Sequence, residues 1–476
     1  FRAFLTHNYD ALSALAALEQ VYHSGSPFGM AQVRKLYDGL AASVRDMAEA
    51  LNVLAHGRYA ALAGALERID AEARAVLETR ALPPDCPLIL PLEAVGAAQI
   101  PFIGAKAGNL ARLGNELGVP VPRGFAVTAR AFELFLDSAG LSEKIAGLLD
   151  GLDLEAPRAL ETTCRDIRAL ILAADLPPEL AREVNAAYAA LEARTRPGVF
   201  VAVRSSAVGE DTEASFAGQY ATVLGVDRAG LAAAYKTVAA SKYTPHALLY
   251  RTRHGLEDRD APMCVAVIEM IDAAAAGVAY TRDPGAPGAE TFRVAGIWGL
   301  GEPLVGGEVS ADTFILDRRG GGVLRAEIAR KERRLVCVPG GGARMEDVPE
   351  ELRRAPVLDS DRLAELLGHG LALEHFFGGP QDMEWAVDQD GRLVLLQCRP
   401  LGLEPEEPEA GEVARDLEPL LTGGQTASRG AASGRVFLAD GRDLAGLPEN
   451  AILVVRTTNP AYAALAGRIR GLVAEV

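Results

Sequence analysis

The strongest constraint on the fold of this chain is the segment QDMEWAVDQDGRLVLLQCRP, Gln381 to Pro400. Polar and apolar residues alternate along it, which predicts two β-strands, and Asp390-Gly391 between them is typical of a two-residue tight turn. Such a turn fixes which residues face each other across the hairpin. Four polar side chains then share one face in two facing pairs, Asp382 with Arg399 and Glu384 with Gln397.

The shared face of this hairpin predicts a particular chemistry. Three side chains with hard oxygen atoms and one guanidinium converge there, which is what a Mg²⁺–polyphosphate site requires. The opposite face, with Met383, Trp385 and Val387, is expected to be buried. A solvated polar face with one cross-strand salt bridge is the alternative interpretation.

A second segment, FVAVRSSAVGEDTEASFAGQYATVLGV, runs from Phe200 to Val226. A short β-type run leads into a loop rich in Gly, Ser and acidic residues, and Arg204 stands where the strand becomes the loop. A guanidinium held there can clamp a phosphate with two hydrogen bonds. Small residues allow backbone N–H groups to approach an anion, among them Ser205, Ser206, Gly209, Ser215 and Gly218. The alternative is a surface loop with Arg204 in a salt bridge.

Two further loops contain clustered glycines. In IGAKAGNL, Gly104, Lys106 and Gly108 precede a helix whose free N–H groups would point at the loop, so Lys106 is placed to meet a phosphate. A solvated lysine on a helix cap is the alternative. In WGLGEPLVGGEVSADTFILD, glycines surround Glu302 and Glu308. This flexible acidic loop could approach a metal-bound nucleotide or simply turn a corner.

The charge and cysteine content exclude several classes of protein. A formal net charge of −16 argues against nucleic acid or an anionic membrane as the main partner. The five cysteines are widely separated and never in CxxC spacing, so neither a disulfide framework nor a zinc site is indicated, and a reducing cytoplasm fits best. The most apolar long window, Ala261 to Tyr280, contains Glu269 and Asp272, so we expect no membrane span, and we see no signal sequence.

The pattern along the chain predicts several domains. Apolar residues at three- and four-residue steps predict a bundle of three helices over residues 1–82, in which His7 and His56 are surface or cap histidines rather than a phosphoacceptor. The proline-rich run from Leu82 to Glu93 predicts a linker. A mixed α/β region follows, divided into residues 92–262 and 263–401. The acidic GLEPEEPEAGE is expected to be an extended hinge before a last domain, 413–476. Because the first residue is Phe1 rather than Met, we expect a fragment or a processed form.

Within the mixed region the elements are also predicted. Helical segments are expected over 129–195 and from Arg228 to His254. Strands rich in Val, Ile and aromatic residues are expected at 263–270, 277–281, 291–297 and 313–316, and further strands at 452–455 and 472–476.

Seven separated motifs resemble, in the right order, the nucleotide-binding domain of the phosphoenolpyruvate synthase and pyruvate phosphate dikinase family. They are GAKAGNL, VPRGF, VRSSAVGEDTEASFAGQY, EMI followed by GVAYTRDP, WGLGE, DMEWAVD and LQCRP. The full set is far more specific than any one motif. The resemblance covers residues 95–401 and implies an ATP-grasp-like fold, in which two α/β subdomains clasp ATP. Residues 413–476 resemble the start of the family's swivelling phosphohistidine domain, whereas the N-terminal helices match no part of the family pattern.

The resemblance also implies roles for ten residues. It makes Lys106 and Arg204 the catalytic phosphate ligands, and Glu384 and Gln397 the ligands of Mg²⁺. It places the side chains of Glu302, Asp382 and Arg399 around the phosphates. It places the backbone of three consecutive residues, Glu269, Met270 and Ile271, at the adenine edge.

Three positions depart from the family pattern. Ala105 stands where the loop commonly has Gly, and Ile268 stands where a Gln commonly precedes the adenine-binding hinge. His246 stands where Asp-Arg-Ala is usual, and we expect it to weaken the phosphate clamp.

The mechanism that the resemblance implies cuts ATP between its α and β phosphates. A pyrophosphoryl group passes to a histidine and AMP leaves, mostly through positioning and charge neutralisation. The forms WGLGE and DMEWA favour the synthase type, with pyruvate and water as final acceptors. The Gly-Gly-x-x-Ser-His segment and the pyruvate-binding barrel are expected outside this chain.

Two alternatives stay open at this point. One is a dikinase with another acceptor, such as a rifampin phosphotransferase, because such enzymes share the same ATP-site motifs. The other is a non-catalytic nucleotide-binding module whose helical bundle docks a partner. A homodimer is a further expectation.

Overall fold

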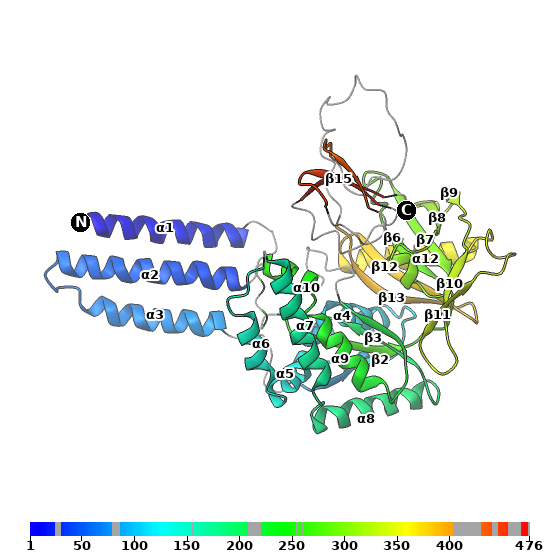
Figure 1. Ribbon diagram of the computed structural model, residues 1–476, viewed down its shortest axis with the longest axis horizontal. Helices are drawn as coiled ribbons and strands as arrows, with labels where there is room; N and C mark the ends of the chain where they lie inside the picture. Colours follow the sequence, from blue (N-terminus) through cyan, green and yellow to red (C-terminus); the bar gives the residue numbers. More distant parts are fainter. Residues whose placement is uncertain are drawn as a thin grey trace, which may run out of the picture.

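The computed structural model describes residues 1–23, 30–78, 86–154, 156–207, 220–253, 256, 258, 261–402, 430–439, 446–455 and 468–474. The loop residues Gly209, Ser215 and Gly218 and most of the acidic hinge lie outside the described residues. Helices and strands alternate between residues 89 and 400, which confirms the mixed α/β class (Figure 1). No helix of the described residues is long and apolar enough to cross a membrane.

Three long helices form the N-terminal part, as the apolar spacing predicts. They are α1 (Arg2–His23), α2 (Met30–Leu54) and α3 (Ala61–Glu78). They lie side by side in Figure 1, and α2 contacts both α1 and α3. His7 approaches Asp46 of α2 to 4.0 Å, and His56 follows the end of α2 with a φ of 51°. His7 is a half-buried residue of α1 and His56 an exposed residue of the turn after α2, which fits the interpretation of both as surface or cap histidines.

A five-stranded antiparallel sheet forms the first half of the mixed region, with the strand order β1-β2-β5-β3-β4. Its strands are β1 (Ile89–Pro91), β2 (Gly124–Val127), β3 (Val201–Ser205), β4 (Thr222–Val226) and β5 (Val265–Glu269). Its helices are α4 (Ile100–Asn115), α5 (Ala129–Ser138), α6 (Leu141–Leu149), α7 (Pro157–Ala173), α8 (Pro178–Arg194), α9 (Leu231–Ser241) and α10 (Pro245–Arg253). Two 3-10 turns, Leu92–Ala94 and Ala97–Gln99, precede α4.

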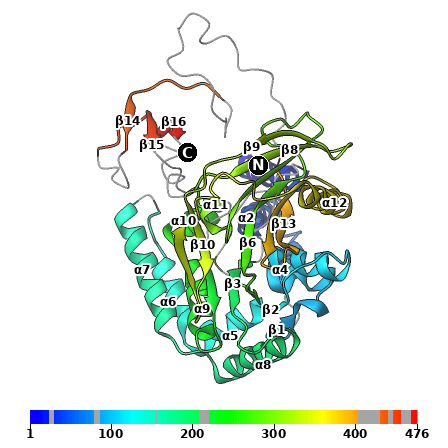
Figure 2. The ribbon, with the colours of Figure 1, turned by 90° about the vertical axis from the view of Figure 1, so that its right-hand side faces the viewer.

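Side chains pack against both faces of this sheet. Because alternate residues of a strand point to opposite faces, they contribute to two different hydrophobic cores. Val201, Val203 and Val267 pack against α5 and the helices around it. The other face carries small residues such as Ala126, Ala202 and Ala266, and these let α4 approach closely with Ala107 and Leu110. Figure 2 shows α4 next to β13 (Leu393–Pro400), a strand of the other large sheet, and the two elements are in contact.

The structure refines two expectations in this half. The run from Leu82 to Glu93 is not a linker throughout, because Ile89–Pro91 forms β1 and pairs with β2. Pro91 is tolerated there because β1 is an edge strand, which need not donate every ladder hydrogen bond. The helical segment from Arg228 to His254 is divided into α9 and α10. The division precedes Pro245, since the residue before a proline is disfavoured in helical geometry.

A six-stranded antiparallel sheet forms the second half, with the order β13-β12-β6-β7-β8-β9. Its strands are β6 (Ala273–Tyr280), β7 (Thr291–Trp298), β8 (Asp312–Asp317), β9 (Val323–Glu327), β12 (Gln381–Asp388) and β13 (Leu393–Pro400). One face packs on α12 (Ser360–Phe377) through a core that contains Phe292, Leu366 and Trp385. The hairpin of β10 (Arg333–Cys337) and β11 (Ala343–Asp347) and the short helix α11 (Glu302–Val305) complete this half.

A small parallel sheet lies near the C-terminus, with the order β14-β15-β16. Its strands are β14 (Val436–Leu438), β15 (Ala451–Val455) and β16 (Ile469–Ala474). The strands expected at 452–455 and 472–476 correspond to β15 and β16.

Candidate nucleotide site

The hairpin of β12 and β13 carries the polar face that the sequence predicts. The register pairs Asp382 with Arg399 and Glu384 with Gln397, which confirms both expected pairs. The Nε and Nη2 atoms of Arg399 donate to Oδ2 of Asp382 at 2.8 and 2.6 Å. Met383 and Trp385 are fully buried on the opposite face. One face of the hairpin therefore belongs to the core and the other is available for a ligand.

The turn of the hairpin differs from the expectation, although the register at the polar face does not. Asp388 and Arg392 flank a loop of three residues, and Gly391 adopts a φ of 79° within it. A β-bulge between Glu384 and Trp385 makes Leu396 the additional residue on β13. The longer loop and the bulge shift the register in opposite directions, so the predicted pairs are right.

Arg204, at the end of β3, joins the first sheet to this hairpin. Its Nη2 atom donates to Oε2 of Glu384 at 2.7 Å and to Oε1 of Gln397 at 2.9 Å. Its Nη1 atom donates to the carbonyl of Leu396 at 3.4 Å. A bulged residue loses its regular ladder partner, so the bulge turns this carbonyl toward the site. The two residues expected to bind Mg²⁺ thus converge on a single nitrogen atom.

The loop around Lys106 is held against the same place. Gly104 interrupts α4 with a φ of 77°, and the helix resumes with the residues that follow it. The N–H of Ala107, in that first turn, donates to Oγ of Ser206 at 2.9 Å. Farther along α4, Nδ2 of Asn109 donates to the carbonyl of Cys398 at 3.3 Å. The helix therefore brings Lys106 together with β3 and β13.

A cavity of about 400 Å³ lies between the two sheets. Six of the ten predicted site residues line it: Arg204, Glu269, Met270, Ile271, Glu302 and Glu384. Its other walls are mainly apolar and include Ala202, Ile268, Leu300 and Leu396. Size and lining suit a nucleotide whose base is buried between apolar walls. Gln397 accepts a hydrogen bond from the cavity-lining Arg204. The charges of Lys106 and Arg399 act on Glu384, and Asp382 is paired with Arg399, so these three residues lie near the cavity as well.

The expected adenine edge is only partly open to a ligand. The N–H of Glu269 donates to the carbonyl of Arg123 at 2.8 Å, and the N–H of Met270 donates to the carbonyl of Phe200 at 2.9 Å. Sequence reasoning could not foresee these bonds, because they depend on how β5 pairs with its two neighbours. Of the three backbone N–H groups, that of Ile271 is therefore the one proposed to donate a hydrogen bond to the base.

The charges around the cavity affect two carboxylates in opposite directions. Burial alone would raise the pKa of Glu384, but the charge and hydrogen bond of Arg204, with Lys106 and Arg399, hold it below the ordinary value. Burial raises the pKa of Glu302, and the neighbouring Glu308 adds to this effect. The ionised Glu384 is thus the stronger of the two as a ligand for a cation.

The donor atoms of the site fit a magnesium ion that arrives with a nucleotide. Glu384 and Gln397 supply one carboxylate and one amide oxygen, both hard ligands directed at the same point. Among the described residues there is no cluster of three or more His, Cys, Asp or Glu side chains that could hold a metal alone. Mg²⁺ is usually held by one or two carboxylates together with substrate phosphates, so this donor set suits it.

The three departures from the family pattern occupy different positions. Ile268 lies in β5, is buried and lines the cavity, whereas Ala105 lies in α4 beside Lys106. His246 lies on α10, where burial lowers its pKa. His246 does not line the cavity, so its effect on a phosphate stays a prediction.

Glu384→Gln is expected to reduce the sensitivity of the fold to acid. Because the pKa of Glu384 is lowered in the folded state, its contact with Arg204 stabilises the protein at neutral pH and is lost as the pH falls through that value. The variant should be less stable by about 1 to 2 kcal/mol at neutral pH, and the difference should shrink as the pH falls below the ordinary range of a glutamate pKa. Urea unfolding at a series of pH values measures it. A difference that stays constant with pH would contradict the expected role.

Comparisons with known proteins show which family this chain resembles. The family model for the pyruvate phosphate dikinase AMP/ATP-binding domain matches residues 100–418. A probable phosphoenolpyruvate synthase of Methanocaldococcus jannaschii is 35% identical over 375 residues, which cover 78% of this chain and 31% of that protein. The phosphoenolpyruvate synthase of Pyrococcus furiosus is 32% identical over 415 residues, which cover 77% and 50%. A rifampicin phosphotransferase of a Streptomyces species is 37% identical over 318 residues, which cover 66% and 36%. The chain spans half or less of the length of these three relatives.

Proposed function

This chain belongs to the phosphoenolpyruvate synthase and pyruvate phosphate dikinase family, and we therefore propose that it is the ATP-binding part of a dikinase. The observation that carries the proposal is the convergence of Arg204, Glu384 and Gln397 beside the cavity between the two sheets. The two sheets would act as the two subdomains of an ATP-grasp-like fold, within the domains 92–262 and 263–401. In our proposal the base lies against Met270 and Ile271, and the phosphates extend toward Arg204.

The polar residues of the site would have three different roles in the proposed reaction: metal binding, phosphate binding and charge neutralisation. Glu384 and Gln397 would hold a magnesium ion, which supplies positive charge to the phosphates when it is bound. Arg204 would then exchange the side-chain oxygens of Glu384 and Gln397 for phosphate oxygens, because these two side chains would hold the ion instead. Lys106 and Arg399 would neutralise the charge that develops on the transferred group.

The proposed overall reaction first transfers the β,γ-phosphates of ATP to a histidine and releases AMP. Water then takes the γ-phosphate as free phosphate, and the β-phosphoryl group that stays on the histidine passes to pyruvate, giving phosphoenolpyruvate. The test supplies the full-length protein with Mg-ATP and pyruvate and separates the nucleotides by chromatography. The expected result is AMP at no more than about one equivalent per enzyme without pyruvate, and continued formation of AMP once pyruvate is added. ADP as the sole product would reject a dikinase.

A second candidate is a dikinase for rifampin, which the similarity to the Streptomyces rifampicin phosphotransferase favours. The same assay with rifampin in place of pyruvate distinguishes the two. A non-catalytic nucleotide-binding module is the third candidate. Mg-ATP binding without AMP release with either acceptor would favour it.

The location and assembly of the protein are part of the same proposal. We propose a reducing cytoplasm as the location, because the five cysteines are widely separated in the sequence and never in CxxC spacing. The N-terminal helices, proposed as a domain of residues 1–82, expose apolar side chains such as Tyr9 and Ile69. We propose that exposed apolar side chains of these helices form the contact of a homodimer, and sedimentation of wild type and Ile69→Glu is the corresponding test.

A further inference from the structure

A row of four polar side chains crosses the second sheet beside the proposed metal ligands. The register pairs Arg399 with Asp382, Asp382 with Tyr280, and Tyr280 with Arg293. Directly paired residues of antiparallel strands point to the same face of a sheet. All four side chains therefore share the face that carries Glu384. Tyr280 and Arg293 did not stand out in the sequence, because neither strand register nor neighbouring charge can be read from their local motifs.

The position of this row fits the far end of a triphosphate. Along β12, Ala386 and Glu384 line the cavity, and Asp382 is the next residue on the same face. Two residues of a strand span about 7 Å, so the row lies one such step beyond the metal ligands. A nucleotide with its base near Met270 and its metal at Glu384 would therefore direct its terminal phosphate toward this row.

The charges of the row suit an anion. Arg399 and Arg293 flank the pair of Asp382 and Tyr280, one on each side. Each arginine also has a carboxylate partner, Asp382 at 2.6 Å and Asp283 at 3.4 Å respectively. Burial and the Asp382 carboxylate raise the pKa of Tyr280, against the influence of Arg399 and Arg293. The hydroxyl thus stays protonated at neutral pH and can donate a hydrogen bond.

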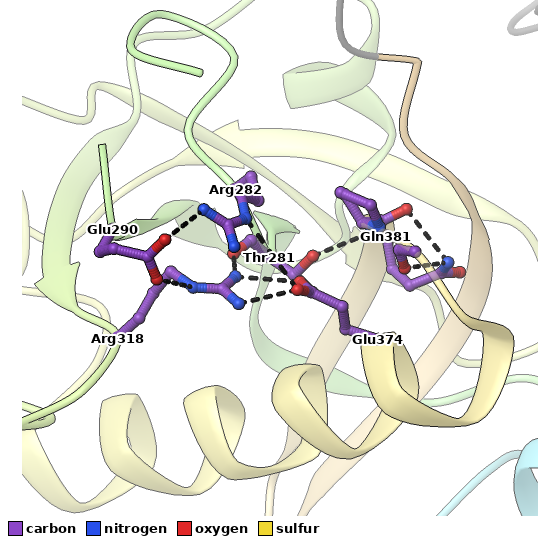
Figure 3. Close-up of polar contacts among 8 residues, drawn as sticks. Thr281, Arg282, Glu290, Arg318, Glu374 and Gln381 are labelled. Atoms are coloured by element: carbon purple, nitrogen blue, oxygen red, sulfur yellow. Dashed lines mark hydrogen bonds and ion pairs between the residues drawn. The ribbon is translucent and has the colours of Figure 1, made fainter. Parts of the chain in front are cut away.

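The strand ends that carry Tyr280 and Asp382 are fixed from the opposite face. The N–H of Thr281 donates to the carbonyl of Gln381 at 2.9 Å, and the N–H of Gln381 donates to Oγ1 of Thr281 at 2.8 Å. Figure 3 shows this pair beside Glu374 of α12, which accepts two hydrogen bonds from Arg318 at 2.9 and 2.8 Å. Arg282 is tied to Glu290 at 2.7 Å in the same network. Residues adjacent to Tyr280 and Asp382 are thereby locked, so the row needs little reorganisation to bind a ligand.

We propose that Tyr280 is a phosphate-contacting residue whose hydroxyl donates a hydrogen bond to the terminal phosphate of ATP. Arg293, on the neighbouring strand, adds positive charge beside that phosphate. The group recognised is the pyrophosphoryl end of the nucleotide rather than the nucleoside. This inference rests on the proposed nucleotide-binding function and adds to it the means by which the site distinguishes ATP from AMP.

Calorimetric titration of the 476-residue chain with ATP and with AMP, both in excess Mg²⁺, tests the inference. A hydrogen bond to a charged group corresponds to about a tenfold or larger change in affinity. Tyr280→Phe should therefore weaken ATP binding about tenfold and leave AMP binding unchanged. Arg293→Gln should weaken ATP binding in the same selective way. Tyr235→Phe is the matched control, since its hydroxyl is buried in α9 without a hydrogen-bond partner among the described residues.

The outcomes separate this inference from the function on which it rests. If the wild-type chain binds neither nucleotide, both the proposed function and the inference are overturned. If the wild type binds both and Tyr280→Phe leaves the ratio of the two affinities unchanged, only the inference fails. An equal loss of ATP and AMP binding would assign Tyr280 a structural role and also overturn it.

Discussion

Arg204→Ala is expected to weaken Mg-ATP binding by at least about 100-fold, which corresponds to about 3 kcal/mol. The guanidinium is the group that connects the two sheets at the cavity, through Glu384, Gln397 and the Leu396 carbonyl. Removing it takes away the proposed phosphate clamp and the ion pair that links the two sheets beside the cavity. Isothermal titration of the purified chain with Mg-ATP measures the loss.

Two variants make this result specific. Arg204→Lys keeps the charge but not the planar fork that serves two oxygen atoms at once, so an intermediate loss is expected. Arg334→Ala removes an ion pair with Glu346 of nearly the same exposure, in the β10–β11 hairpin, and should bind Mg-ATP as the wild type does. Equal binding by wild type and Arg204→Ala would remove Arg204 from the site.

Gly104→Ala is expected to destabilise the fold by about 2 to 5 kcal/mol and to weaken Mg-ATP binding as well. A Cβ atom at Gly104 would stand 1.8 Å from the carbonyl oxygen of Ser206 and 2.6 Å from its carbon, and backbone must move to admit it. The φ of 77° adds the cost of a left-handed conformation for alanine. The displacement would separate Ala107 from Ser206 and carry Lys106 away from Arg204.

Gly118→Ala separates the cost of the positive φ from the cost of the steric clash with Ser206. Gly118 also has a positive φ, 67°, but a Cβ there would have no neighbour within 4 Å. Its substitution should therefore cost only the conformational term, about 1 to 2 kcal/mol, with normal nucleotide affinity. Urea unfolding of both variants provides the comparison. Equal destabilisation by the two substitutions would show that the contact with Ser206 contributes nothing.

Sequence reasoning reached the polar face of the hairpin because strand alternation acts over short distances. It missed the three-residue loop and the bulge at Leu396, since nothing in local alternation distinguishes a bulged residue from a paired one. The two errors cancelled at Glu384 and Gln397. The direction of the Leu396 carbonyl toward Arg204 could be learned only from the structure.

The residue types of the site could be predicted, but not their partners. Arg204 stands in a sequence context suited to phosphate, yet its bonds to Glu384 and Gln397 span 180 and 193 positions. The use of the Met270 N–H by Phe200 likewise depends on the pairing of β3 with β5. Tertiary pairing of this kind leaves no local periodicity, so the pairing of Asp382 with Tyr280 and of Tyr280 with Arg293 also escaped notice.

Some elements of the fold escaped for a different reason. The strand β1 lies in a run with four prolines, where composition favours a linker, but an edge strand beside β2 accommodates Pro91. The division before Pro245 had a visible signal in the sequence. The helical apolar pattern continues on both sides of Pro245, however, and it therefore predicted one helical segment where the structure has two.

The separation of the site residues along the chain sets the order in which the site can form during synthesis. Ala107 meets Ser206 across 99 positions, Arg204 meets Glu384 across 180, and Asn109 meets Cys398 across 289. The first sheet has all its strands once residue 269 has left the ribosome, whereas β13 ends only at Pro400. Because domains fold as they emerge, the first sheet can form before Arg204 has its partners. A nascent chain should therefore bind the nucleotide only after residue 400 has been translated. Chains stalled before that point should gain no protection from protease when Mg-ATP is added.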